Sequence, residues 1–502
     1  MAKIRPRPSQ SCKGLLLSIL SVALTLWGSE ARAGRDDLDA QLRAVLRDAG
    51  FTGRIESTLT ARLGRPLDPK KVELGRLLFF DKILGLHNDN SCAGCHNPAN
   101  GFGDSQPIAI GVQNNDIVGP HRRGPRNQRR SPAVANTAFY PALMWTARFV
   151  ALSGDPFDNS KGFLFPVPPP EDLLFEQTLG IAQASLPSTE LVEMAGFTGV
   201  QDDPGSLGPE FAQFDDGKSE PLPREDATGT RNAGILARVT ERLNAIPAYL
   251  QLFGDAFNNG VPLAPGQVDI HMRREALGEF QMAITAANAP LDQFARGDNA
   301  AMSAEQKRGA LLFFSKTGCV DCHAVAGEAN EMFSDFKLHR IAGPQVFPDF
   351  GVGKGNVAFE NGTEDFGEEE TSGDPSHRYM FRTAPLRNLA VAIAFFHNGT
   401  FGSFENAIKH HLNPIESART YNPKHNHLAS DLHVGPIEPV LALGIDPLLR
   451  DPPQLSQKEI QELTAFVSQA LLDPKVFDFC KLVPKRVPSG LPLQKFQGCE
   501  DD

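Results

Sequence analysis

The motif Cys-x-x-Cys-His occurs twice in this chain, at residues 92–96 and 319–323. This pattern is typical of covalent c-type haem attachment. The two thiols bond the two porphyrin vinyl groups, and the histidine that follows lies under the iron as its proximal ligand. We therefore predict two covalently bound c-type haems. The expected residues are Cys92, Cys95 and His96 for the first haem and Cys319, Cys322 and His323 for the second, with His96 and His323 on the iron.

Each motif follows a segment with the same apolar sequence. Gly-x-Leu-Leu-Phe-Phe stands at residues 75–80 before the first motif and at residues 309–314 before the second. Helix starts are predicted at Asp68, an N-cap that is followed by proline, and at Ser303, which opens a capping box. The repeated pair of helix and motif is an internal repeat, and it predicts two related haem domains.

The second domain also has a candidate closing helix. A capping box at Ser456 opens an apolar stripe formed by Ile460, Leu463, Phe466, Val467 and Leu471. Helical sequence between residues 236 and 294 is expected to join the two domains and to pack on both. The predicted fold class is therefore mainly α, with two cytochrome c-like haem domains, long loops and few strands.

The length of 502 residues exceeds what one ordinary core accommodates. We predict a signal peptide over residues 1–33 and an N-terminal haem domain over residues 34–296. A C-terminal haem domain is predicted over residues 297–472, and residues 473–502 form a tail that packs back on the body.

Residues 1–33 have the organisation of an export signal. A basic start precedes an apolar run from Leu15 to Trp27, and Ala31-Arg32-Ala33 is a small-x-small cleavage site. The apolar run is shorter than the roughly 20 residues of a membrane span, and an uncleaved anchor is the alternative. No other stretch is long and apolar enough to span a membrane. We therefore expect an exported, periplasmic protein without a membrane span after cleavage.

Charge and cysteine content fit this location. The net charge of −11 argues against nucleic acid and anionic membrane surfaces as partners. Of the seven cysteines, Cys12 lies in the signal and four lie in the haem motifs, which leaves Cys480 and Cys499. An even pair in an oxidising compartment predicts a disulfide, with two free thiols as the alternative.

The second axial ligand decides what each haem does. Side-chain ligands on both faces of the iron favour electron transfer, whereas an open face binds small oxygen-containing ligands. After His96 no His or Met occurs before His121, which lies in an arginine-rich segment. His121 as a sixth ligand is therefore the alternative to an open first iron. Near the second haem, His410 and His411 are adjacent, and at most one of them faces the iron because neighbouring helical residues point about 100° apart.

The sequence resembles the bacterial di-haem cytochrome c peroxidase family, which also contains the MauG-type enzymes. The resemblance covers nearly the whole chain after the signal. The matching stretches are residues 74–81, 91–96, 130–136, 319–323, 381–388 and 396–399. The resemblance implies that the haem on His96 reacts with peroxide and that the haem on His323 transfers electrons.

The same resemblance assigns further site residues. The family pattern of Gln, Pro and Glu is met by Gln183, Pro187 and Glu193. Glu193 is the implied acid–base group above the open iron, and Gln183 assists it; a carboxylate there can move a proton between the peroxide oxygens. Trp145 matches the tryptophan that family members place between the haems, and His397 matches a histidine near the second haem.

Three positions depart from the family pattern. Val112 stands where peroxidases that need reductive activation carry a histidine, which implies a permanently open first haem. His411 stands where classical members have Met and MauG-like members have Tyr, which implies a His/His second haem of lower potential. The resemblance also implies a calcium ion as a further cofactor, but Arg130 replaces an asparagine ligand and speaks against it.

These observations lead to one functional hypothesis and two alternatives. The hypothesis is a periplasmic cytochrome-c peroxidase-like oxidoreductase that reduces hydrogen peroxide to water with electrons from a small cytochrome c or cupredoxin. The first alternative is a MauG-like enzyme that oxidises a partner protein or an organic substrate through a high-valent haem. The second is a non-catalytic di-haem electron-transfer protein. Family members often form dimers, so a homodimer is a further expectation.

Overall fold

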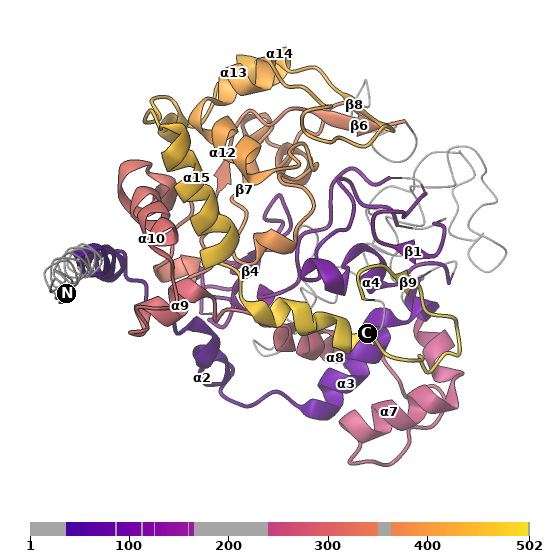
Figure 1. Ribbon diagram of the computed structural model, residues 1–502. Helices are drawn as coiled ribbons and strands as arrows, with labels where there is room; N and C mark the ends of the chain where they lie inside the picture. Colours follow the sequence, from indigo (N-terminus) through magenta and orange to yellow (C-terminus); the bar gives the residue numbers. More distant parts are fainter. Residues whose placement is uncertain are drawn as a thin grey trace, which may run out of the picture.

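The computed structural model describes residues 37–85, 88–111, 114–124, 126–158, 160–164, 239–349 and 363–499. The described chain is mainly helical, and its strands are short (Figure 1). This agrees with the expected fold class of a mainly α protein with few strands. None of the described helices is long and apolar enough to cross a membrane.

A pair of crossing helices organises the first part of the core. Helix α3 (Pro69–Phe80) begins at Asp68, whose side chain accepts the backbone N–H of Lys70 at 2.8 Å, as predicted. It packs against α8 (Ile270–Ala283). The helices approach so closely that a Cβ on Gly75 would lie 1.9 Å from the backbone oxygen of Ala276. Glycine at this position therefore sets the distance between the two helices.

A second pair repeats this arrangement. Helix α10 (Ala304–Leu311) begins with the predicted capping box of Ser303, and α15 (Gln457–Ala465) begins with that of Ser456. Here a Cβ on Gly309 would lie 1.9 Å from the backbone oxygen of Glu462. The equal clearance shows that the sequence repeat is also a repeat of packing.

Helix α8 thus has a more specific place than the linker expected between residues 236 and 294. It stands in the first pair as α15 stands in the second. Helix α7 (Pro247–Phe257) packs on α3 as well, and Tyr249 donates a hydrogen bond to Asp81 at 2.6 Å. Both elements belong to the core around the first haem motif.

We call the core around α3 and α8 the first unit and the core around α10 and α15 the second unit. The N-terminal end of the described chain packs on the second unit, and the C-terminal end packs on the first. The helix over residues 37–48 contributes Leu42 and Leu46 to the core formed by α10 and α15. The 3₁₀ segment Pro474–Leu482 follows α15 and contributes Val476 and Phe479 to the core formed by α3 and α8. The N-terminal helix thus packs with the C-terminal haem motif, and the C-terminal segment packs with the N-terminal haem motif.

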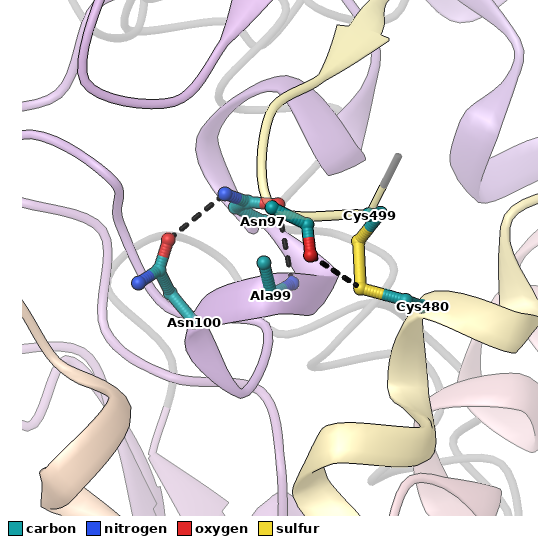
Figure 2. The surroundings of a disulfide bond; sticks show 6 residues. Asn97, Ala99, Asn100, Cys480 and Cys499 are labelled. Atoms are coloured by element: carbon teal, nitrogen blue, oxygen red, sulfur yellow. Dashed lines mark hydrogen bonds between the residues drawn. A yellow bond between two sulfur atoms is a disulfide. The ribbon is translucent and has the colours of Figure 1, made fainter. Parts of the chain in front are cut away.

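The C-terminal segment is tied to the loop after the first haem motif. Strand β9 (Lys495–Phe496) pairs in parallel with β1 (Ile117–Val118). Cys480 and Cys499 form a disulfide, which confirms the predicted bridge. Figure 2 shows this disulfide beside residues Asn97–Asn100, the turn that follows His96.

The remaining elements are short. The other helices are α2 (Leu59–Leu63), α4 (Cys92–Cys95), α9 (Pro290–Ala295), α11 (Glu369–Ser372), α12 (Phe404–Leu412), α13 (Pro414–Arg419) and α14 (Glu438–Ala442). Antiparallel strands pair as β2 (Ala142–Leu143) with β3 (Phe149–Ala151), β3 with β4 (Phe163–Leu164), β5 (Leu338–His339) with β7 (Phe381–Arg382), and β6 (Val346–Pro348) with β8 (Leu432–Val434). Helix α12 carries His410 and His411 toward the α10–α15 pair.

Candidate haem sites

Both Cys-x-x-Cys-His motifs form the same single turn. The backbone N–H of His96 donates to the oxygen of Cys92 at 2.9 Å, and that of His323 donates to the oxygen of Cys319 at 2.8 Å. The thiols of Cys92, Cys95, Cys319 and Cys322 are free of disulfides. Each turn therefore presents two thiols and one imidazole from consecutive parts of one backbone loop.

Each motif histidine is held by a backbone carbonyl. His96 Nδ1 lies 3.1 Å from the oxygen of Phe102, and His323 Nδ1 lies 2.9 Å from the oxygen of Phe333. A carbonyl can only accept, so Nδ1 carries the proton and Nε2 keeps a lone pair for a metal. Burial lowers the pKa of both imidazoles to about 4, so both are neutral at physiological pH, as metal ligands must be.

The two motif histidines also share an aromatic environment. Phe79 lies 6.3 Å from His96 between ring centroids, and Phe313 lies 6.5 Å from His323. Phe280 of α8 packs on Phe79 at 5.3 Å, and Phe466, which follows α15, packs on Phe313 at 5.2 Å. In each pair of helices, a phenylalanine in or just after one helix therefore connects the helix–helix contact to the motif histidine.

His411 lies at a distance from His323 that would accommodate one metal ion between the two rings. Their ring centroids are 6.4 Å apart. An imidazole nitrogen binds a transition metal at about 2 Å, so two imidazoles on opposite sides of one metal have centroids about 6 Å apart. His411 Nδ1 donates to the oxygen of Ala407 at 2.8 Å, which leaves its Nε2 for a metal. Burial lowers the pKa of His411 and favours the neutral form.

His410 has a different environment. Its Nε2 lies 2.8 Å from the oxygen of Ile341, and its Nδ1 lies 3.1 Å from the hydroxyl of Ser417. Both ring nitrogens are therefore occupied by the protein, and the side chain is fully buried. Of the two adjacent histidines, His411 alone has a nitrogen free to bind a metal opposite His323.

Trp145 lies where the two units meet. Its Nε1–H donates to the oxygen of Arg130 at 2.7 Å, and its own oxygen accepts from the N–H of Arg382 at 2.7 Å. The N–H of Arg130 in turn donates to the oxygen of His397 at 2.8 Å. His397 is buried and stacks on Phe381 at 3.6 Å, and burial lowers its pKa to about 4. Hydrogen bonds through the backbone of Arg130 therefore join the indole of Trp145 to the segment that carries His397.

One cavity of about 560 Å³ connects these features. This volume is within the range of sites for cofactors and drug-sized ligands. Its lining includes Cys319, Cys322, His323, His411, Trp145, Arg130 and His397. Free thiols, two opposed neutral imidazoles and a mainly apolar wall fit a haem. Cys319, Cys322, His323 and His411 would hold it.

Comparison with known proteins agrees with this chemistry. Residues 69–300 match the family model of the di-haem cytochrome c peroxidases. Methylamine utilization protein MauG of Methylorubrum extorquens is 27% identical over 409 residues, which cover 82% of this chain and 80% of that protein. Over residues 69–300 the chain is similar to the di-haem cytochrome c peroxidase family, and the relatives that match it include MauG proteins and cytochrome c peroxidases.

Two further proteins are similar at lower sequence identity. Cytochrome c551 peroxidase of Pseudomonas aeruginosa is 25% identical over 354 residues, which cover 70% of this chain and 75% of that protein. The solved structure of the diheme peroxidase BthA from Burkholderia thailandensis has 18% identity and a TM-score of 0.49, over 86% of this chain and 91% of that one. Similarity to the di-haem cytochrome c peroxidase family implies two haem cofactors, in agreement with the two motifs.

The first haem site differs from the second in its described surroundings. Within the described ranges, no second imidazole faces His96; its ring contact is with Phe79. His121 is exposed, and its Nδ1 lies 3.2 Å from the side-chain oxygen of Gln497. Val112, Gln183, Pro187 and Glu193 lie outside the described residues.

Several site residues were missed by sequence reasoning. Phe102 and Phe333 provide the carbonyls that orient the motif histidines, and both have positive φ, 57° and 59°. No spacing rule marks them, because they lie at different distances from their motifs. Phe280 could have been found: Leu277-x-x-Phe280 in α8 matches Leu463-x-x-Phe466 after the second capping box.

The expectation about a calcium ion stays a prediction, since an asparagine side chain is among the ligands that the resemblance implies. In the part of the chain that the structure describes, no group of three or more His, Cys, Asp or Glu side chains is placed to hold a metal ion. The guanidinium of Arg130 is itself buried, and one of its nitrogens donates to the oxygen of Asp104 at 3.3 Å. A permanent cation thus lies between the two units.

Proposed function

We propose that this chain is a periplasmic di-haem c-type peroxidase that reduces hydrogen peroxide to water. Electrons come from a small cytochrome c or cupredoxin. The observation that carries this proposal is the asymmetry of the motif histidines: His323 is opposed by His411, whereas His96 is opposed by no described imidazole. Two side-chain ligands suit electron transfer, and one suits the binding of a small ligand.

In this proposal the domain of residues 34–296 carries the reactive haem and the domain of residues 297–472 carries the electron-transfer haem, although the helix over residues 37–48 packs in the core of α10 and α15. The haems, attached through the four motif cysteines, supply the irons that bind peroxide and exchange electrons. His96 is kept neutral by burial and is oriented by the carbonyl of Phe102. Glu193, supported by Gln183 and Pro187, moves a proton from one peroxide oxygen to the other.

Trp145 is the proposed relay between the two domains. Its indole N–H is held by Arg130, and Arg130 is held in turn by His397. This chain of contacts fixes the indole relative to the second haem cavity, which Trp145 lines. These hydrogen bonds would keep the indole ring in a fixed position on the proposed electron route between the two domains.

A test of the acid–base role is steady-state peroxide reduction with reduced cytochrome c. We expect Glu193→Gln to lower turnover by about 10²–10⁴-fold, the usual contribution of a positioned acid–base group. Glu305→Gln makes the same chemical change at an exposed position in the first turn of α10 and serves as the control. Undiminished turnover in Glu193→Gln would rule out the assignment.

A MauG-like function is the second candidate. It is favoured by the MauG of M. extorquens, which is matched over more of this chain than the cytochrome c551 peroxidase. In that case the same site oxidises a partner protein or an organic substrate. Peroxide consumption that is slow with reduced cytochrome c and fast with such a substrate would favour this candidate.

A non-catalytic electron-transfer protein is the third candidate. It requires a second side-chain ligand on the first iron. A resting-state EPR spectrum separates it from both enzymes, because an open first haem gives a high-spin signal and two closed haems give low-spin signals only. A spectrum with low-spin signals only would contradict the proposal that the first haem has an open face.

A further inference from the structure

Arg130 is a buried cation with unused hydrogen-bonding capacity. The residue is 6% exposed, and its main chain is fully engaged by Trp145 and His397. Its Nη2 donates to the backbone oxygen of Asp104 at 3.3 Å. Its Nη1 is buried and has no hydrogen-bond partner among the described residues.

The nearest carboxylate does not use this nitrogen. Asp104 Oδ1 accepts from the N–H of Gln106 at 2.8 Å, and Oδ2 accepts from the N–H of Ser131 at 2.9 Å. Burial raises the pKa of Asp104, although the charge of Arg130 opposes this shift. Asp104 is thus an electrostatic neighbour whose oxygens are directed at backbone amides rather than at the guanidinium.

The other arginines that line the same cavity are satisfied. Arg387 makes a bidentate pair with Asp292, at 2.7 and 2.8 Å. Arg382 donates to the oxygens of Met144 and Thr383, at 2.7 and 3.2 Å. Among these three arginines, Arg130 alone has a buried N–H without a partner.

An arginine side chain remains charged in a protein, and an uncompensated buried charge costs several kcal/mol. A group that enters the cavity and pairs with Nη1 must therefore be an anion, and a carboxylate matches the guanidinium geometry best. A porphyrin attached through its vinyl groups carries two propionate carboxylates on the opposite edge. The cavity lined by Arg130 is also lined by Cys319 and Cys322, the proposed vinyl attachment points.

We propose that Arg130 binds a propionate carboxylate of the haem attached at Cys319 and Cys322. This inference rests on the proposed function in that it requires a haem at the second motif. Arg130 would then fix the edge of that haem through its side chain and the indole of Trp145 through its backbone oxygen. One residue would thereby position both partners of the proposed electron route.

The experiment compares the haem-loaded variants Arg130→Gln and Arg130→Lys with the wild type. Arg123→Gln is the matched control, since it removes one positive charge from an exposed position of the same segment. Spectroelectrochemical titration in mildly alkaline buffer, where a propionate stays ionised, gives the midpoint potential of each haem. Resonance Raman spectra give the propionate bending modes. Haem content per chain is measured separately by pyridine haemochrome absorbance.

We expect Arg130→Gln to lower the midpoint potential of the second haem, because loss of a nearby positive charge favours the ferric state. Its propionate mode should shift as well. Arg130→Lys should leave the midpoint potential close to that of the wild type, because the positive charge is kept. It should still shift the propionate mode, because an ammonium group cannot form the two parallel hydrogen bonds of a guanidinium. Arg123→Gln should change neither.

Three results would overturn this inference. The first is an unchanged potential and an unchanged propionate mode in Arg130→Gln that carries two haems. The second is a change confined to the first haem. If Arg130→Gln does not load haem, an unchanged mode in Arg130→Lys is decisive in the same direction. Peroxide turnover is not a readout here, so a wild type that binds two haems without turnover contradicts the proposed function and leaves this inference standing.

Discussion

The substitution Gly309→Ala tests whether the α10–α15 contact sets the geometry of the second haem site. The added Cβ would lie 1.9 Å from the backbone oxygen of Glu462, and real Cβ atoms essentially never lie within 3.0 Å of another heavy atom. The helices must therefore separate by about 1 Å at the crossing. Overpacking typically costs about 1–3 kcal/mol, and about 2–3 kcal/mol is expected here because the obstructing atom belongs to the backbone and not to a flexible side chain. The better helix propensity of alanine offsets about 1 kcal/mol of that cost.

The expected net loss is about 1–2 kcal/mol of unfolding free energy, or a fall in Tm of about 3–6 °C. Circular dichroism followed during heating of the haem-loaded protein gives this value. Since Phe466 connects α15 to Phe313 and His323, the low-spin EPR signal of the second haem should also broaden or shift.

The matched comparison is Gly75→Ala, which meets the oxygen of Ala276 at the same 1.9 Å and should perturb the first haem instead. Ala304→Gly, at an exposed position of α10, measures the propensity effect without a packing partner. An unchanged or raised Tm in Gly309→Ala would refute the view that glycine at this crossing is required by backbone contact.

The remaining predictions concern ligands and the C-terminal segment. His411→Ala should convert the second haem from low-spin to high-spin in the resting EPR spectrum, whereas His410→Gln should leave it low-spin and lower Tm, since both nitrogens of His410 bind protein groups. A low-spin second haem in His411→Ala would show that another residue is the ligand. Cys480→Ser together with Cys499→Ser should cost about 3 kcal/mol in urea unfolding, the chain-entropy value for a loop whose ends are 19 residues apart; an unchanged midpoint would contradict the role of the bridge. His121→Ala should leave the EPR signals of the first haem unchanged, because His121 is exposed and pairs with Gln497, and a new high-spin signal would identify it as a ligand.

Local signals in the sequence predicted local structure well. The caps at Asp68, Ser303 and Ser456 form as expected because each depends on residues within three positions of one another. The Cys480–Cys499 bridge followed from counting, since the other cysteines had assigned places. Such inferences need no knowledge of the tertiary fold.

Contacts between distant segments were harder to predict. The role of α8 depends on the close approach of Gly75 to Ala276, and this approach is invisible until the two helices are paired. Helix spacing left His410 and His411 as alternatives, and the family resemblance favoured His411. The structure adds a physical reason that the sequence does not contain: the hydroxyl of Ser417 and the carbonyl of Ile341 occupy both ring nitrogens of His410.

The exchange of end segments between the two units has a mechanical consequence. The helix over residues 37–48 is anchored in the core of α10 and α15, and the segment Pro474–Leu482 is anchored in that of α3 and α8. Ser91, which directly precedes the first motif, donates a hydrogen bond to the side chain of Gln494 at 2.9 Å, although 403 positions of chain separate the two residues. Moving the units apart would extract an apolar segment from each core at once. If the proposed function holds, this arrangement would keep the separation of the two haem sites constant while partners bind and leave.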